Sequence, residues 1–149
     1  MNLTLAHIGG RAGASDFFEA LVRMYVGRTA AYFPCEAAGF RSSAALREWI
    51  EKPKTRIAPT VVLLDSRGKA LSSEELAGWI GTRRDQGTRH LVFAIGPADG
   101  WDEEARRRAH LLLSLGPMTL AHSLARVVVA EQVYRACTIL AGHPYHTGH

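Results

Sequence analysis

The chain lacks the sequence signatures of several large enzyme classes. It contains no GxGxxG, GxxxxGK(S/T), GxSxG or CxxC motif, which removes the usual markers of dinucleotide, nucleoside triphosphate, hydrolase and dithiol redox chemistry. Its two cysteines, Cys35 and Cys137, lie in opposite halves of the chain and form no motif. Such sparse cysteine usage is typical of proteins from a reducing compartment, and we expect a cytoplasmic location.

Membrane and metal signatures are also missing. No apolar run approaches the roughly 20 residues needed to span a bilayer, and no cationic segment precedes the apolar residues of the N-terminus, as a signal peptide would require. His143 and His146 have a spacing that metal ligands can adopt, but Pro144 prevents a regular helix and no cysteine or carboxylate follows nearby. We therefore expect no membrane association and no metal site.

Length and charge indicate one modestly basic domain. The 149 residues are 47% hydrophobic and 21% charged and carry a net charge of +4, which is typical of a single globular domain over residues 1–149. The basic residues are scattered along the chain. Doubled in a dimer, this charge would favour an acidic partner such as nucleic acid, but it does not identify one.

Strand-like and helix-like segments alternate along the chain. Strands are predicted at residues 3–8, 32–37, 60–65, 90–95 and 111–115, and helices at 16–30, 44–51, 72–86, 102–109 and 124–141. Asp16 with Glu19, and Ser72 with Glu75, have capping-box spacing, while Ser43 is predicted to cap the helix that follows it. A turn is predicted at residues 66–68. The alternation predicts an α/β domain with a mostly parallel sheet flanked by helices.

Loops that follow the buried strands are the natural place for a ligand. In parallel sheets ligands bind beyond the carboxyl ends of the strands. The loops after Leu64, Ile95 and Leu115 qualify by position. Gly96 and Gly116 would let the backbone approach a ligand closely, because they carry no side chain.

The last helix is apolar on nearly every face, so it should pack against the sheet and against something beyond it. Arg126 falls on the apolar side. Two interpretations are open: its stem covers apolar surface while the guanidinium reaches water, or the arginine binds an anion such as an RNA phosphate. Tyr145, flanked by His143 and His146, is either part of a non-specific tail or a ring on which a nucleobase stacks.

Several motifs together resemble one known family. They are LLDSRGK at 63–69, LSSEE at 71–75, FAIG--DG at 93–100, LSLG-MTL-H at 113–122, L-RV--AEQ-YRA at 124–136 and ILAGHPYH at 139–146. In these motifs the chain resembles the ribosomal RNA large-subunit methyltransferase H family, the small stand-alone members of the SPOUT methyltransferases. The resemblance covers roughly residues 61–146, and the terminal HPYH after the AEQ-YRA helix is its most specific part.

The resemblance implies a SPOUT-type trefoil-knot α/β fold, a homodimer, and methylation of N3 of a pseudouridine in 23S rRNA with S-adenosylmethionine as the methyl donor. The target lies in a large-subunit hairpin loop at the ribosomal subunit interface, and the assembled ribosome is the expected substrate. The cofactor positions carry over to Leu64, Gly96, Leu115, Gly116, Pro117, Met118, Thr119 and Leu120. Arg126, Tyr145 and His146 are the expected catalytic residues, and together with His143, in the substrate-facing tail 143–149, they are expected to meet the RNA. For the proton on N3, His146, Tyr145 and water aided by Arg126 all remain possible acceptors.

The chain departs from the family pattern in two places. Gly96-Pro97 stands where the family has Ile-Gly-Gly after the middle strand, and proline fixes φ and removes a donor. Residues 31–59 show no family pattern. Two alternatives therefore stay open: a catalytically impaired RNA-binding dimer of the same fold, and a flavodoxin-like enzyme acting on a small molecule.

Overall fold

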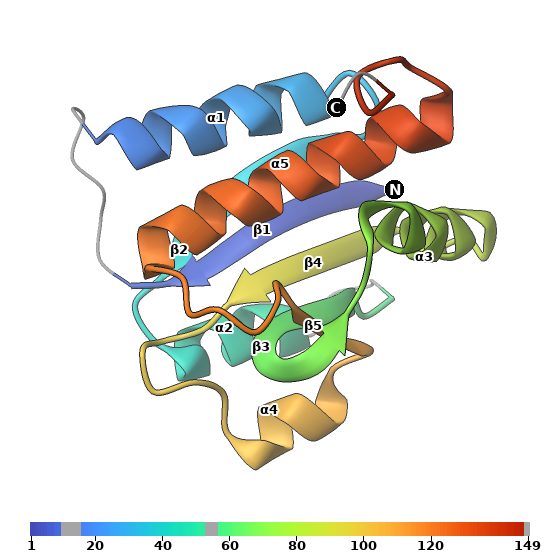
Figure 1. Ribbon diagram of the computed structural model, residues 1–149. Helices are drawn as coiled ribbons and strands as arrows, with labels where there is room; N and C mark the ends of the chain where they lie inside the picture. Colours follow the sequence, from blue (N-terminus) through green and yellow to red (C-terminus); the bar gives the residue numbers. More distant parts are fainter. Residues whose placement is uncertain (10–15, 53–56, 148–149) are drawn as a thin grey trace.

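Short apolar runs separated by helices form one parallel sheet. We describe residues 1–9, 16–52 and 57–147 in a computed structural model. The strands are β1 (Asn2–Ile8), β2 (Cys35–Phe40), β3 (Thr60–Ala70), β4 (His90–Ile95) and β5 (Leu111–Ser114), in the order β2-β1-β4-β3-β5 (Figure 1). Every pairing is parallel, so the predicted α/β class with a parallel sheet is confirmed.

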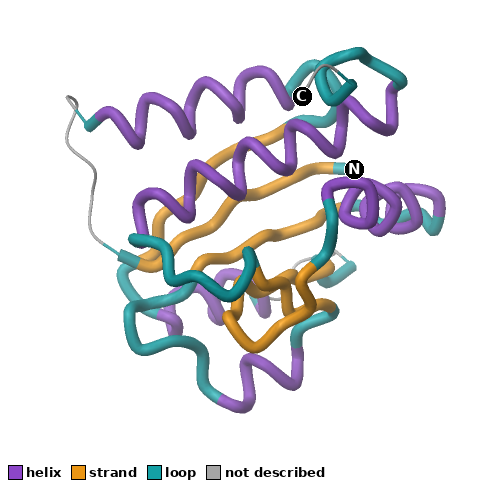
Figure 2. Tube along the Cα trace, viewed as in Figure 1, coloured by secondary structure: helices purple, strands orange, loops and turns teal. Residues whose placement is uncertain are grey.

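Helices cover both faces of this sheet. On one face lie α1 (Phe17–Thr29), α3 (Ser73–Asp85) and α5 (His122–Ala141); on the other lie α2 (Ser43–Glu51) and α4 (Glu103–Arg108) (Figures 1 and 2). The long helix α5 lies between α1 and α3 and contacts both. The sequence of α5 predicts that it packs against the sheet and against a second surface, and α1 and α3 supply part of that second surface. No helix in the described ranges is long and apolar enough to cross a membrane.

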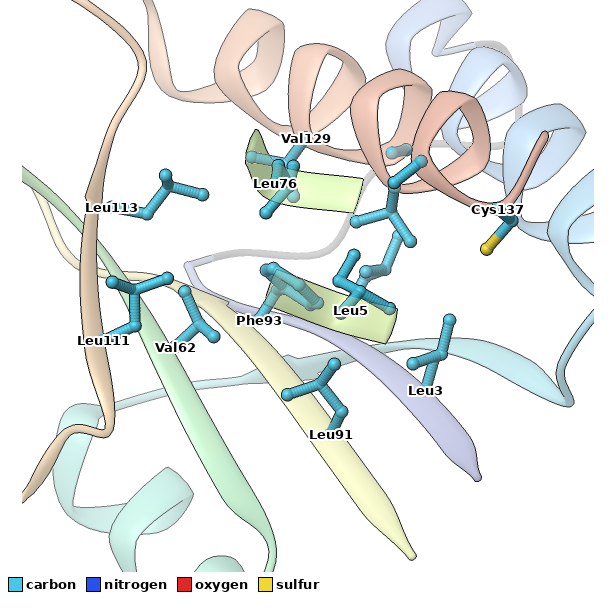
Figure 3. Packing of buried hydrophobic residues seen from close by; sticks show 14 of the residues in the cluster. Leu3, Leu5, Val62, Leu76, Leu91, Phe93, Leu111, Leu113, Val129 and Cys137 are labelled. Carbon is cyan, nitrogen blue, oxygen red and sulfur yellow. The ribbon is translucent and has the colours of Figure 1, made fainter. Parts of the chain in front are cut away.

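Side chains alternate between two buried layers. Along β1, Leu3 and Leu5 belong to the cluster beneath α5, whereas Ala6 and Ile8 belong to the cluster beneath α2 and α4. Figure 3 shows the first cluster, in which Leu residues of the sheet lie below Val129 and Cys137 of α5. Burial of a leucine-sized side chain contributes about 1.5–3 kcal/mol, so the helix layer is held mainly by these contacts.

Local capping signals place the helix starts closely. The Oδ1 of Asp16 accepts hydrogen bonds from the backbone N–H groups of Phe18 and Glu19, and Ser72 and Glu75 form the complete predicted capping box. The cap of α2 was predicted one residue too late: it is Ser42, whose extended backbone (φ −156°) precedes the first helical residue. The start of α5 is at His122, two residues before the predicted boundary.

Two predictions for the strands were wrong. The second strand spans Cys35–Phe40 rather than 32–37, because Tyr32 and Phe33 bond back to the carbonyl of Thr29 at the end of α1. Residues 66–68 do not end the third strand. Its pairing with β5 is interrupted after Leu64 and resumes at Lys69.

The glycine that suggested a turn has another role. A Cβ on Gly68 would lie 2.5 Å from the backbone carbonyl of Leu112. Glycine at this position therefore lets β3 pass close to the backbone of β5, where Leu64 and Lys69 both pair with Leu113 and residues 65–68 loop out between them.

Candidate functional site

A hollow of about 330 Å³, here called the β5 hollow, opens where β5 ends. Its walls come from residues 70–73, residues 113–116 and one side of α5, with Phe93 and Leu76 between them. The segments that follow β3 and β5 lie at this edge of the sheet (Figure 1). The volume is within the range of roughly 300–1,000 Å³ found for small-molecule sites.

Two small polar contacts shape the wall of the hollow. The hydroxyl of Ser73, at the start of α3, donates to Oε1 of Gln132 on α5 at 2.6 Å. The hydroxyl of Ser114 accepts from the N–H of Gly116 and donates to its carbonyl, both at 3.1 Å. Gly116 has a φ of +117°, and apart from its chain neighbours no heavy atom of the described residues lies within 4 Å of the place where its Cβ would be. The backbone of this loop is thus held in an open, accessible conformation.

The predicted cofactor residues are not all at this hollow. Leu115 and Gly116 line it, whereas the loop beyond them runs outward: Pro117 and Thr119 are exposed, and the side chain of Met118 is 80% exposed. We therefore expect residues 117–120 to contact a ligand only if they fold over it.

Leu64 and Gly96 meet a tryptophan instead. The indole N–H of Trp101 donates to the Leu64 carbonyl at 3.0 Å. A Cβ on Gly96 would lie 2.8 Å from the Trp101 ring. Trp101 is buried in the layer beneath α2 and α4. The packing of its ring explains why position 96 needs glycine, a residue that the sequence suggested would let a ligand approach the backbone. Pro97 begins a tight turn closed by the N–H of Gly100.

Arg126 is largely buried and already binds an anion within its own chain. Its Nη1 donates to Oε2 of Glu19 on α1 at 2.8 Å, and the two side chains are 10% and 20% exposed. His7, at the end of β1, and His122, in the first turn of α5, lie beside this pair. Burial lowers the pKa of His7 to about 4, and Arg126 adds to this effect. Both interpretations of Arg126 are therefore incomplete: it does bind an anion, but a carboxylate of its own chain.

The tail folds back onto α3 and α5. The ring of Tyr145 packs edge-on against Tyr134, with centroids 4.8 Å apart, and the guanidinium of Arg135 lies over it. Burial raises the pKa of Tyr145. His143 is exposed, and its Nδ1 accepts from the N–H of Tyr145. Residues 148–149 of the predicted tail lie outside the described ranges.

Both ring nitrogens of His146 are engaged. Nη1 of Arg135 lies 3.1 Å from Nδ1, and because a guanidinium can only donate, Nδ1 must accept. The other nitrogen, Nε2, therefore carries the proton and donates to Oε1 of Glu74 at 2.6 Å. This hydrogen bond lowers the pKa of Glu74. In this position of the tail, His146 has no free lone pair with which to accept a proton.

The predicted catalytic residues lie at opposite ends of one helix. Arg126 is in the second turn of α5, and the tail begins after Gly142, which ends the helix with a φ of +71°. Sixteen residues of α-helix span about 24 Å. One protomer therefore does not bring Arg126 to the same nucleobase as Tyr145 and His146.

Sequence reasoning missed the partners of these residues. Glu19 had been assigned to a capping box, and Glu74 and Trp101 had no assigned role. Each of these three residues contacts a residue that is distant in the sequence, and the spacing of residues within a short segment does not predict such a contact. Among the described residues, no group of three or more histidine, cysteine or acidic side chains is placed to hold a metal ion.

Comparisons with known proteins agree on one family. A family model described as "Predicted SPOUT methyltransferase" matches residues 1–146. The chain is 50% identical over 131 residues to the ribosomal RNA large subunit methyltransferase H of Koribacter versatilis, a match covering 88% of this chain and 89% of that protein. A protein of the same name from Brucella anthropi is 58% identical over 86 residues, covering 58% of this chain and 54% of that protein. Among solved structures, the SpoU methyltransferase AviRb from Streptomyces viridochromogenes, in complex with the cofactor AdoMet, matches with a TM-score of 0.47 and 10% identity, covering 95% of this chain and 61% of that one.

Proposed function

This chain belongs to the SPOUT methyltransferase family, and from that premise we propose that it methylates N3 of a pseudouridine in 23S rRNA with S-adenosylmethionine as the methyl donor. The relatives named ribosomal RNA large subunit methyltransferase H support the reaction and the substrate class. The family motifs LSLG-MTL-H and AEQ-YRA supply residues of the wall of the β5 hollow. That coincidence of motif and hollow is the observation that carries the proposal.

The β5 hollow fits this cofactor in its chemistry. Its walls are largely apolar, with backbone groups of Leu115 and Gly116 and the polar pair Ser73–Gln132 at the edge. The open space beside Gly116 is one that a side chain would fill. S-adenosylmethionine supplies a methyl group that is already activated, so the protein chiefly has to bind, orient and exclude water.

For the proton on N3 the contacts favour one of the open alternatives. Both ring nitrogens of His146 are hydrogen-bonded in this tail position, so His146 has no free lone pair for the proton. The raised pKa of Tyr145 favours the protonated hydroxyl, so Tyr145 does not act as a base. In the proposed reaction the proton passes to water, and the guanidinium of Arg126 stabilises the anionic base that remains. Tyr145 stacks on the nucleobase and His143 contacts its edge, and His146 does so once its ring leaves Glu74 and Arg135.

The active unit is a homodimer in this proposal. Two copies packed antiparallel along α5 would place Arg126 of one copy beside the tail of the other, which one copy does not achieve. Exposed apolar side chains occur on these two neighbouring helices: Phe17 (83% exposed), Phe18 and Leu21 on α1, and Leu124 (40%) on α5. Exposed apolar residues of this size are common in protein interfaces.

We expect sedimentation to give the mass of a dimer at micromolar concentration. Leu124→Asp and Phe17→Asp should shift the protein toward monomer, since a charge would be buried at the interface. Ile57→Asp is the control, because Ile57 is 70% exposed but lies on neither α1 nor α5. A stable wild-type monomer would contradict the dimer.

We expect Gly116→Val to lose affinity for S-adenosylmethionine by about 10- to 200-fold, the range for a misfitting methylene-sized group. The valine side chain would fill the open space beside residue 116. Gly87→Val is the matched control: Gly87 also has a positive φ (+83°) and an open environment, but it follows α3. Calorimetric titration measures both variants, and equal affinities would place the cofactor elsewhere.

The function itself is tested in two steps. The first is a calorimetric titration of the protein with S-adenosylmethionine. The second is methyl transfer to ribosomes from a strain that lacks this modification, compared with protein-free rRNA to identify the true substrate.

Binding without transfer would favour the catalytically impaired RNA-binding dimer. Pro97 gives that alternative no support, because it lies in a turn and not in the wall of the β5 hollow.

A further inference from the structure

The side chain of Glu19 is not used to cap the helix in which it lies. Glu19 is the third residue of α1, where a glutamate commonly reaches back to cap the helix. Here the carboxylate of Asp16 accepts from both Phe18 and Glu19. The Glu19 carboxylate is instead directed at Arg126, a residue 107 positions away in the sequence.

Arg126 needs such a partner. It follows the first turn of α5, which has no acidic residue, and the N-cap Ala121 makes no side-chain hydrogen bond. A cation near the positive end of the helix dipole is unfavourable by itself. The neighbouring His7 and His122 are no substitute, because an imidazole carries no negative charge. Glu19 supplies the missing charge, and at 20% exposure its carboxylate is little screened by water.

Among the described residues, the pair with Glu19 uses only part of the guanidinium's hydrogen-bonding capacity. A guanidinium has five N–H donors in a fixed fork, and Glu19 takes the bond from Nη1. A carboxylate on one nitrogen fixes the plane of the group and the direction of its other donors. Arginine fixed in this way loses less conformational entropy when it meets a second anion.

We propose that Glu19 is a positioning residue for methyl transfer, which holds the guanidinium of Arg126 in the orientation that acts on the RNA. This inference rests on the proposed function, in which Arg126 faces the anionic base. Glu19 itself touches neither RNA nor cofactor.

The test compares Glu19→Ala with Glu19→Gln in steady-state methyl transfer to unmodified ribosomes. Glu19→Ala should lower kcat by about ten- to a hundredfold, the scale of a misplaced group, with KM for ribosomes and affinity for S-adenosylmethionine within about twofold. Glu19→Gln keeps an acceptor for Nη1 and should recover most of kcat. Glu104→Ala is the control, because it removes exposed ion pairs with Arg47 and Arg108 on the opposite face of the sheet and should change nothing.

A second comparison separates positioning from folding. In an Arg126→Ala background, Glu19→Ala should cause no further loss of kcat, because it acts through the arginine. An unchanged or increased kcat in Glu19→Ala overturns the inference, and so does an equal loss in both backgrounds. If the wild-type protein does not methylate ribosomes, the proposed function fails. Exchange of the Arg126 Nη–H protons, followed by NMR, then still reports on the pair. These protons should be protected in wild type and Glu19→Gln and should exchange faster in Glu19→Ala. Equal protection in all three proteins overturns the inference that Glu19 orients Arg126.

Discussion

Removing the chain from His143 onward should abolish methyl transfer while leaving the fold and cofactor binding largely intact. The tail follows Gly142, which ends α5, and its described residues 143–147 do not line the β5 hollow. It carries the ring and imidazoles that are proposed to orient the nucleobase. The edge-on contact of Tyr145 with Tyr134 is worth about 0.5–1.5 kcal/mol beyond its buried area. We therefore expect the truncation to lower the melting temperature by only a few degrees, the shift that loss of one such contact produces.

Point variants show which part of the tail matters. Tyr145→Phe keeps the ring and should retain most activity, whereas Tyr145→Ala should lose nearly all of it if the base stacks there. His146→Ala should release the tail from Glu74 and Arg135 without removing the aromatic ring of Tyr145. Methyl incorporation into ribosomes and calorimetric titration with S-adenosylmethionine measure these effects. A truncated protein that methylates at the normal rate would falsify the assignment of the RNA-facing tail.

Arg126→Ala should lower kcat by about a hundredfold or more, as removal of one preorganised donor to a developing negative charge does. It should also lower the free energy of unfolding by about 1–3 kcal/mol, because a largely buried Glu19 carboxylate loses its partner. If the guanidinium also contacts a phosphate, the slope of RNA affinity against salt should fall by about one unit or less.

Two further variants separate the catalytic from the structural effect. Arg126→Lys keeps a cation for Glu19 but not the planar fork, so it should restore stability more than kcat. Combining Arg126→Ala with Glu19→Ala removes the stranded carboxylate and should recover stability but not activity. Urea unfolding and methyl transfer measure the two effects. If stability and activity recover together in the double variant, Arg126 has a structural role only.

Much of the secondary structure follows from the sequence because its signals are local. The run Val61 to Leu64 is apolar without interruption, as expected for a strand covered on both faces, and β4 matches its predicted bounds. Ser72 with Glu75 and the αL residue Gly142 mark helix ends through contacts within a few residues. The errors fall where a distant segment decides, as at Gly68, where the backbone of Leu112 requires the glycine.

For the site, the sequence by itself determined which residues are proposed to carry chemistry: the loop at Leu115 and Gly116, the arginine at 126, and the aromatic and histidine tail. These are recognisable because residue type and spacing are properties of a short segment. Only the tertiary structure decided their partners, with Arg126 on Glu19, His146 between Glu74 and Arg135, and Gly96 beneath Trp101. Such pairings depend on how helices and strands remote in sequence pack on one sheet, and the energy that selects them is shared over the whole core.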